Sequence, residues 1–228
     1  MTAIDDARIE TADAPSMHGA LANLDEEHDY WLDEVVGRVP LDLKGRFIRN
    51  GPGRQRIGDT PYGHWFDGCG MLSLFSIAGG KVHFKNRYIR TPKYLRETAT
   101  QQIKYRGFGT QIPGGLRKNI GRMPGNPANT NTVYHGGKLL ALYEGGRPFE
   151  VDPSTLGTVG EYTDDGELTK ANVFSAHGHF HGPTGHWVNF GTGSMGCGRR
   201  GPKLCFNIFR IDTSGKMIAK GQLPVDFF

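Results

Sequence analysis

Short runs in which apolar and polar residues alternate recur along most of this chain. Residues 71–77 and 81–89 flank one Gly-Gly pair, and residues 132–135 and 138–143 flank another. Alternation with a period of two puts every second side chain on one face of a strand, and a glycine turn between two such runs predicts a β-hairpin. We therefore expect hairpins over residues 71–89 and 132–143.

Further runs of the same kind extend the series. Residues 149–153 and 157–160 predict a third hairpin, and residues 187–190 and 204–211 predict later strands. Residues 46–49 predict a strand that ends in a turn at the Asn-Gly-Pro-Gly sequence. Hairpins repeated at this spacing predict an all-β fold, either a β-propeller or a sandwich.

One segment, residues 92–128, interrupts this series. Residues 92–102 predict a short helix, and a long Gly- and Pro-rich loop follows it. A loop of this length in a compact β fold is usually functional or disordered. Residues 1–30 are polar and acidic and predict a flexible arm, so we divide the chain into an arm (1–30) and a β domain (31–228).

Composition and charge narrow the class of protein. The chain has 34 glycines and 13 prolines among 228 residues, which suits many short strands and tight turns. Its net charge of +4 combines an acidic start, with ten acidic residues and one basic residue in positions 1–36, and a basic remainder. The basic residues are scattered and do not alternate with aromatic residues, so we expect a solvated surface and no nucleic-acid partner.

Cysteine usage and hydropathy predict a location. The three cysteines form no CxxC pair and no even framework, which favours a reducing compartment. The start of the chain has no basic stretch followed by an apolar run, and no segment approaches about 18 consecutive apolar residues. We therefore expect a cytoplasmic protein.

The densest candidate for chemistry is the stretch 175–183, which holds His177, His179 and His181. Neutral imidazole binds first-row metals. On an extended strand the three rings would share one face, about 6.6 Å apart along the chain. A metal lies about 2.0–2.2 Å from its ligand nitrogens, so we expect one ligand from this stretch with partners from elsewhere. A hydrogen-bonded structural histidine is the alternative.

Several segments together resemble the carotenoid cleavage oxygenases. They are GRFIRNGPG (45–53), HWFDGCGML (64–72), KNRYIRTPKYL (85–95), NTNTVYHGGKLLALYEGGRPFEVDPSTL (129–156) and SAHGHFHGPTGHWVNFG (175–191). YRGFGTQIPGG (105–115), followed by PANTN (127–131), is most similar to the bacterial apocarotenoid 15,15′-oxygenase type. The similarity covers about residues 40–215.

The resemblance implies a seven-bladed β-propeller in which four histidines hold Fe(II) and three glutamates orient their rings. His177 matches the first iron ligand, Glu144 matches an orienting glutamate, and Thr130 matches a threonine near the open iron position. A carboxylate that accepts a hydrogen bond from a ligand imidazole fixes its tautomer. The implied reaction is cleavage of a C=C bond in an apolar polyene by O2 to give carbonyl products.

The chain departs from the family pattern in length and at single positions. It is about half the usual length, and the other three histidines would follow residue 228. Cys69 stands where the family usually has aspartate, and Gly178 replaces a proline. Two functions remain open: a carotenoid or apocarotenoid dioxygenase, with stilbene-type substrates as a variant, and a truncated, inactive propeller fragment. A peripheral membrane contact is expected from the substrate class, and the sequence predicts no oligomeric state.

Overall fold

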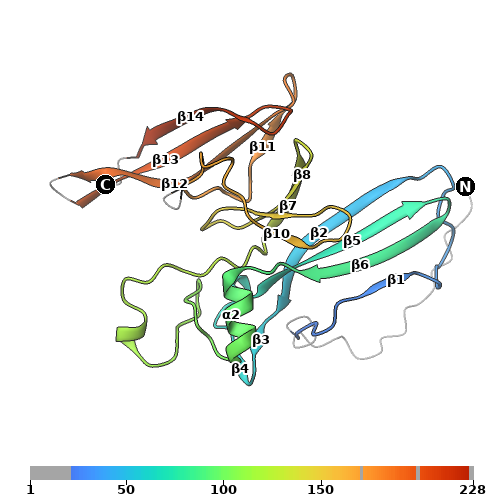
Figure 1. Cartoon of the computed structure of the whole chain (residues 1–228), viewed down its shortest axis with the longest axis horizontal. Helices are drawn as coiled ribbons and strands as arrows, with labels where there is room; N and C mark the ends of the chain where they lie inside the picture. Colours follow the sequence, from blue (N-terminus) through green and yellow to red (C-terminus); the bar gives the residue numbers. More distant parts are fainter. Residues whose placement is uncertain (1–21, 170–171, 199–200, 226–228) are drawn as a thin grey trace, which may run out of the picture.

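The computed structural model describes residues 22–169, 172–198 and 201–225, and β-strands make up most of its regular structure (Figure 1). The strands are β1 (Asp29–Trp31), β2 (Gly45–Arg54), β3 (Arg56–Ile57), β4 (Thr60–Pro61), β5 (Cys69–Ala78), β6 (Lys81–Tyr88), β7 (Asn131–His135), β8 (Lys138–Leu142), β9 (Phe149–Val151), β10 (Thr158–Glu161), β11 (His179–His181), β12 (His186–Gly198), β13 (Gly201–Ile211) and β14 (Met217–Pro224). Within these residues they form antiparallel sheets with the orders β1-β6-β5-β2, β10-β9-β8-β7 and β11-β12-β13-β14, and a β3-β4 ribbon. The predicted all-β class is confirmed.

The three predicted hairpins are present. β5 turns into β6 through Gly79 and Gly80, and β7 turns into β8 through Gly136 and Gly137. All four glycines have positive φ, which is the geometry of the tightest hairpin turns and strains a residue that carries a Cβ. The third hairpin pairs β9 with β10. Local sequence was sufficient to predict these hairpins, because the turn residues and the alternation of apolar and polar residues indicate the same structure.

The predicted turn at residues 50–53 is wrong, because β2 continues through the Asn-Gly-Pro-Gly sequence and Pro52 pairs with Gly70. β2 is an edge strand, where the missing N–H of a proline interrupts no ladder on the open side. Gly53 is required by packing: a Cβ there would lie 2.8 Å from the Cβ of Met71. Tertiary pairing thus overrides a strong local turn signal.

The predicted boundary at residue 30 falls inside β1, which pairs with β6 at the outer side of the first sheet. The residues just before it are also bound to the sheet. The Tyr88 N–H donates to Glu27 Oε1 at 2.8 Å, and the Gln55 N–H donates to Asn23 Oδ1 at 2.8 Å. The described part of the expected arm, from residue 22, is therefore attached to the β domain, and residues 1–21 lie outside the described residues.

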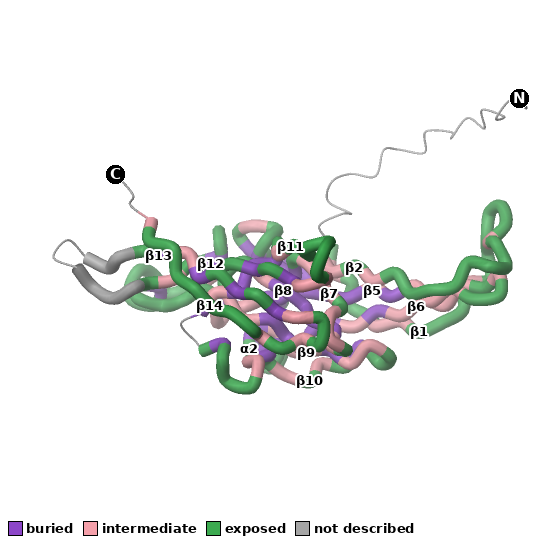
Figure 2. Tube along the Cα trace, turned by 90° about the horizontal axis from the view of Figure 1, so that it is seen from above, coloured by how far each residue is buried: buried purple, intermediate pink, exposed green. Residues whose placement is uncertain are grey.

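Two apolar cores separate the three sheets, and β8 contributes to both. Leu139 and Ala141 lie in the core between the first and second sheets, while Leu140 and Leu142 lie in the core between the second and third. Successive side chains of a strand point to opposite faces, so the apolar run of β8 buries both of its faces. Figure 2 shows this burial concentrated along the middle of the molecule.

Asparagine side chains link the edge strands of neighbouring sheets. Asn50 Nδ2 on β2 donates to the Asn131 carbonyl oxygen on β7 at 2.8 Å. Asn131 Nδ2 donates in turn to the Ala176 carbonyl oxygen, shortly before β11, at 2.8 Å. The edge strands β2 and β7 and the segment before β11 are therefore tied together in order, which is how blades are arranged around a propeller axis.

The segment between β6 and β7 carries the predicted helix, α2 (Pro92–Thr100), and a single turn, η2 (Leu116–Lys118). Thr91 caps α2 by accepting a hydrogen bond from the Tyr94 N–H, and Pro92 occupies its first turn, where no N–H is needed. A further single turn, η1 (Trp65–Asp67), precedes β5.

No helix among the described residues is both long and apolar enough to cross a membrane.

A buried polar cluster fixes α2 to the first sheet. The Lys93 ammonium lies 2.7 Å from Glu97 Oε2, and the Tyr62 hydroxyl donates to the same oxygen at 2.7 Å. Arg54 Nη2 lies 3.2 Å from the Cys69 sulfur. Burial, reinforced by neighbouring groups, raises the pKa of the Tyr62 phenol. The cluster contains two basic side chains, Lys93 and Arg54, but only one carboxylate, that of Glu97. Position 69 contributes a thiol and no second carboxylate.

Candidate metal and substrate site

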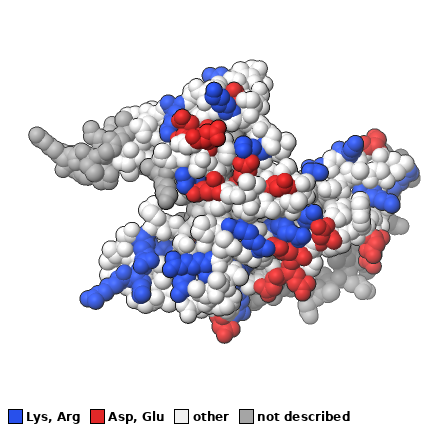
Figure 3. All heavy atoms as spheres, in the orientation of Figure 1, with Lys and Arg blue, Asp and Glu red and all other residues white. Residues whose placement is uncertain are grey.

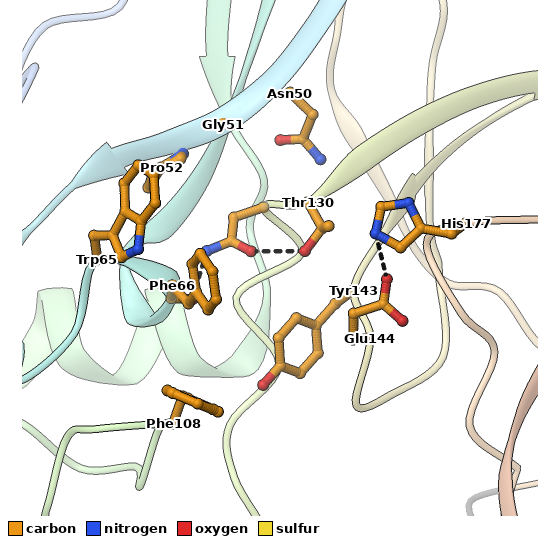
Figure 4. Close-up of a pocket in the computed structure, with 11 residues that line it drawn as sticks. Asn50, Gly51, Pro52, Trp65, Phe66, Phe108, Thr130, Tyr143, Glu144 and His177 are labelled. Atoms are coloured by element: carbon orange, nitrogen blue, oxygen red, sulfur yellow. Dashed lines mark hydrogen bonds and ion pairs between the residues drawn. The ribbon is translucent and has the colours of Figure 1, made fainter.

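A cavity of about 470 Å³ opens where β2 and the segments leading into β7 and β11 meet (Figure 4). Its walls come from β2, from the segments that flank β7, β8 and β11, and from the η1 turn and the insertion that follows β6. Residues far apart in sequence therefore converge on one space. The lining residues are Asn50, Gly51, Pro52, Trp65, Phe66, Phe108, Asn129, Thr130, Tyr143, Glu144 and His177.

Glu144 lies at the edge of this cavity, two residues beyond the end of β8. The strand itself ends at Leu142, so Glu144 lies in the segment that follows it. Its carboxylate is nevertheless held in place: Oε2 accepts from the Ser175 hydroxyl at 2.9 Å, and Oε1 accepts from the Ala176 N–H at 3.3 Å. The second sheet thus presents a fixed carboxylate to the segment that leads into β11.

His177 faces this carboxylate, with Nε2 3.0 Å from Glu144 Oε1. The expectation that all three histidines of the run share one strand face is wrong, because β11 contains only His179 and His181. His177 precedes the strand, and its side chain is 66% exposed at the cavity. Of the three rings, only His177 lines the cavity.

The contact between His177 and Glu144 selects a tautomer. In a neutral imidazole one nitrogen donates and the other carries a lone pair. When Nε2–H donates to Glu144, the lone pair is on Nδ1 and is available to a metal. The pair therefore has the chemistry of an oriented metal ligand.

Thr130 also lines the cavity, in the segment just before β7. Its hydroxyl donates to Asn129 Oδ1 at 3.1 Å, and its N–H donates to the Leu142 carbonyl oxygen at 3.1 Å. Asn129 is anchored in turn by Nδ2 bonds to the carbonyl oxygens of Phe66 and Gly68. The methyl group of Thr130 is therefore the part of its side chain that a cavity ligand would meet.

Aromatic side chains form much of the cavity wall, and sequence analysis missed them. Trp65 and Phe66 line the cavity and remain 57% and 52% exposed. Phe108 and Tyr143 complete this wall. Burial raises the pKa of the Tyr143 phenol, and the Asp67 and Glu144 carboxylates raise it further, so the phenol stays protonated as a hydrogen-bond donor.

The side chains at the cavity are of types that bind metals, but the described residues provide too few of them to hold a metal ion. One imidazole and one carboxylate meet at the cavity, and the described residues contain no group of three or more His, Cys, Asp or Glu side chains arranged to hold a metal ion. A non-haem iron centre needs several such ligands. His177 therefore provides one position of a metal site, and the described residues alone do not complete it.

The profile of one protein family, described as retinal pigment epithelial membrane protein, matches residues 21–227. The chain belongs to this family. Its members include the carotenoid cleavage oxygenases, which depend on non-haem iron, so the sequence resemblance is confirmed.

Two relatives and one solved structure define the similarity. Apocarotenoid-15,15′-oxygenase of Synechocystis is 45% identical over 155 residues, which are 67% of this chain and 32% of the relative. Resveratrol cleavage oxygenase 1 of Aspergillus fumigatus is 34% identical over 213 residues, 92% of this chain and 40% of the relative. The crystal structure of cobalt-substituted Synechocystis apocarotenoid oxygenase gives a TM-score of 0.81 at 36% identity, covering 91% of this chain and 44% of that one.

The chain therefore spans less than half the length of the curated relatives it matches. The fold agrees over nearly all of the chain, and the three sheets correspond to part of a family propeller.

Gly178 is a departure from the family pattern that the structure explains. A Cβ at Gly178 would lie 2.5 Å from Trp187 Nε1 and 2.7 Å from Asn189 Nδ2. Both of these side chains are buried. The glycine therefore lets the segment that carries His177 approach β12 closely.

We expect Gly178→Ala to lower the free energy of unfolding by about 1–3 kcal/mol, because the new methyl group overpacks a buried site. Gly182→Ala, in the same stretch, meets no atom within 4 Å and should change stability by less than about 0.5 kcal/mol. Urea unfolding followed by circular dichroism measures both. Equal stability of the two variants would contradict the close approach.

Proposed function

We propose that this chain supplies part of the active site of an iron-dependent oxygenase that cleaves a C=C bond of a carotenoid or apocarotenoid with O2. The observation that supports this most directly is the contact of His177 with Glu144, at 3.0 Å, on the border of a cavity walled by aromatic rings. A metal ligand beside an apolar space is what oxidation of an apolar substrate requires. Resemblance to both apocarotenoid and resveratrol cleavage enzymes supports the reaction class.

In this proposal His177 would hold Fe(II) through the lone pair of Nδ1, and Glu144 would orient the ring by accepting a hydrogen bond from Nε2–H. Among the described residues, His177 is the only histidine that lines the cavity. Bound iron would supply activation of O2. The chain itself contributes ring orientation, the methyl group of Thr130 as a steric limit beside the metal, and an apolar wall that excludes water.

An apolar polyene is the substrate class that the cavity favours. Trp65, Phe66 and Phe108 offer ring faces and edges without charge. The cavity volume of about 470 Å³ lies within the range typical of small-molecule sites. Tyr143, as a protonated phenol, gives one hydrogen-bond donor for an oxygen-bearing end group, which an apocarotenal has and a hydrocarbon carotene lacks.

Grafting this chain onto the part of the Synechocystis enzyme that it does not match tests the proposal. We expect the graft to hold close to one iron per protein and to bleach an apocarotenal, while the chain alone, with one imidazole, holds iron only weakly. His177→Ala in the graft should abolish both iron binding and bleaching. Iron content is measured by mass spectrometry and bleaching by absorbance.

His179→Ala and His181→Ala are the matched controls, because both rings lie on β11 and neither lines the cavity. They should leave iron content within about twofold of the parent, as surface substitutions do. A folded graft that keeps iron and activity without His177 would overturn its assignment as a ligand. A folded graft with neither iron nor activity would overturn the proposed function.

The membrane contact expected from the substrate class has a candidate surface around η2. Leu116, Ile120 and Met123 are between 66% and 79% exposed. Basic side chains gather at the lower left of Figure 3, where Figure 1 draws this loop. Apolar side chains among basic ones suit an anionic membrane surface, to which each Lys or Arg contributes about 1 kcal/mol. The basic residues of the loop are Arg117, Lys118 and Arg122.

We expect the chain to bind vesicles that contain phosphatidylserine more tightly than vesicles of phosphatidylcholine alone. Ile120→Ser with Met123→Ser should reduce binding about tenfold or more, because each removes a large apolar side chain from the contact. Val36→Ser, at a still more exposed apolar position outside the loop, is the control. Sedimentation with vesicles measures binding, and equal binding of all variants would contradict the proposed surface.

The cytoplasmic location also stays a proposal. Cys69 and Cys205 are free, buried thiols among the described residues, which is consistent with a reducing compartment. Fractionation of the source cells, followed by detection of the chain in the cytoplasmic or membrane-bound fraction, tests it.

A further inference from the structure

Asp67 is a buried carboxylate at the end of the η1 turn. It is 2% exposed, and four groups of one loop donate to it. Oδ1 accepts from the Phe108 N–H at 2.5 Å, and Oδ2 accepts from the N–H groups of Gly109 at 3.0 Å and Thr110 at 2.9 Å. The Thr110 hydroxyl donates to Oδ2 at 2.7 Å. Asp67 thus holds a loop that lies about 40 residues away in sequence.

The loop is shaped around this carboxylate. A Cβ at Gly107 would lie 2.2 Å from Asp67 Cγ, so only glycine leaves room for the side chain. A Cβ at Gly63 would lie 2.3 Å from the Gly109 carbonyl oxygen. The Gly63 N–H also donates to Thr110 Oγ1 at 2.8 Å. The η1 turn and the loop therefore interlock through close contacts and a single carboxylate.

The same two segments carry most of the aromatic wall of the cavity. Trp65 and Phe66 immediately precede Asp67, and Phe108 lies in the loop that Asp67 binds. The ring centroids of Phe66 and Phe108 are 5.8 Å apart, and the His64 ring packs against both at 4.5 and 4.9 Å. Figure 4 shows Phe66 and Phe108 on the same side of the cavity, opposite His177.

We propose that Asp67 is a positioning residue that sets the distance between the two halves of the aromatic wall and thereby selects the apolar ligand that fits the cavity. This inference rests on the proposed function, because it treats the cavity as the substrate site. Phe108 is 73% exposed, and its ring packs against His64 and Phe66 of the neighbouring segment. The hydrogen bond from its N–H to Asp67 ties the Phe108 backbone to the same segment and so restrains its place in the wall.

Two variants disturb this restraint in different ways. Asp67→Asn keeps the shape of the side chain but turns one acceptor into a donor that faces donors. Gly107→Ala keeps the carboxylate but displaces it, because the new methyl group occupies its space. Asp152→Asn is the matched control: Asp152 also accepts four hydrogen bonds, from Ser154 and Thr155, in a turn that does not line the cavity.

Binding of two probes to the purified chain separates positioning from general destabilisation. The probes are all-trans-retinol, a polyene, and resveratrol, a shorter and more polar stilbene, each followed by fluorescence. A variant that only lowers the folded fraction weakens both probes by the same factor. A variant that moves the wall changes the ratio of the two affinities. Thermal unfolding is measured in parallel, and binding is measured well below the melting temperature.

We expect Asp67→Asn and Gly107→Ala each to shift the retinol-to-resveratrol affinity ratio by about tenfold, because a loosened wall loses preorganisation for one ligand more than for the other. Asp152→Asn should leave the ratio unchanged. Wild-type binding with an unchanged ratio in both variants would overturn the role of Asp67 and leave the proposed function standing. A wild-type chain that binds neither probe would overturn both.

Discussion

Replacing Glu97 with glutamine is expected to lower the free energy of unfolding by about 3–5 kcal/mol, because it removes the only carboxylate of a buried charged cluster among the described residues. The Lys93 and Glu97 side chains are 1% and 0% exposed and lie 2.7 Å apart. Arg54 is also buried, and it donates to the Thr98 hydroxyl at 2.7 Å and to the Cys69 sulfur at 3.2 Å. Without the Glu97 charge, two basic groups would remain buried with no negative partner.

The geometry around Glu97 adds to this loss. Its Oε1 accepts from the N–H groups of Lys104 and Tyr105, and its Oε2 accepts from the Tyr62 hydroxyl as well as from Lys93. A glutamine can retain the two acceptor bonds at Oε1, but its amide nitrogen would face the Lys93 ammonium. Glu97 also anchors the start of the long loop, so its loss should loosen the segment that leads to the cavity wall.

Equilibrium urea unfolding measures the effect. Glu161→Gln is the control, because Glu161 is 41% exposed and its partner Arg147, which is 10% exposed, also donates to the Leu168 carbonyl oxygen. A pair with a solvent-exposed carboxylate contributes about 1 kcal/mol or less. If Glu97→Gln were no more destabilising than Glu161→Gln, the stabilising role assigned to the Glu97 charge would be wrong.

Replacing Trp187 with alanine is expected to lower the free energy of unfolding by about 3–5 kcal/mol, the range for removing a buried aromatic side chain. Trp187 is 1% exposed in the core between the second and third sheets. Its ring packs against Phe174, Phe180 and His135, with centroids 5.2 to 6.1 Å apart. Alanine would leave a cavity that rigid strands on both sides cannot close.

Trp187→Phe distinguishes lost packing from lost hydrogen bonding. The Trp187 Nε1 donor is buried without a hydrogen-bond partner in the described structure, so phenylalanine removes an unsatisfied polar group while it keeps most of the apolar volume. We expect a loss below about 1.5 kcal/mol, as for other swaps that conserve most of the volume. The two variants are compared by urea unfolding, and equal losses would show that the indole N–H is bonded in solution.

The local sequence predicted the elements whose backbone hydrogen bonds are made between residues close together in the chain. The hairpin turns at Gly79-Gly80 and Gly136-Gly137 and the helix after Thr91 all rest on residues within a few positions of one another. Prediction failed where a distant strand competed. The Asn-Gly-Pro-Gly stretch became part of β2 because β5 pairs with it and because Asn50 is bonded to β7.

The candidate site was also predicted only in part. The resemblance of short motifs to the family identified His177, Glu144 and Thr130, and all three line one cavity. Their roles as ligand, orienting carboxylate and access residue stay predictions until metal is measured. The aromatic wall escaped prediction because exposed Trp65, Phe66 and Phe108 carry no local pattern that separates a cavity wall from a core.

By itself, the sequence determined the β class, the hairpin turns, the helix and the family, because periodicity, turn glycines and motif order depend on near neighbours. Only the tertiary structure decided that His177 stands apart from His179 and His181, that Asp67 holds a distant loop, and that Gly178 is needed for close packing. These features depend on which segments approach one another across sheets. Such contacts depend on the packing of buried faces, and that packing involves residues far apart along the chain.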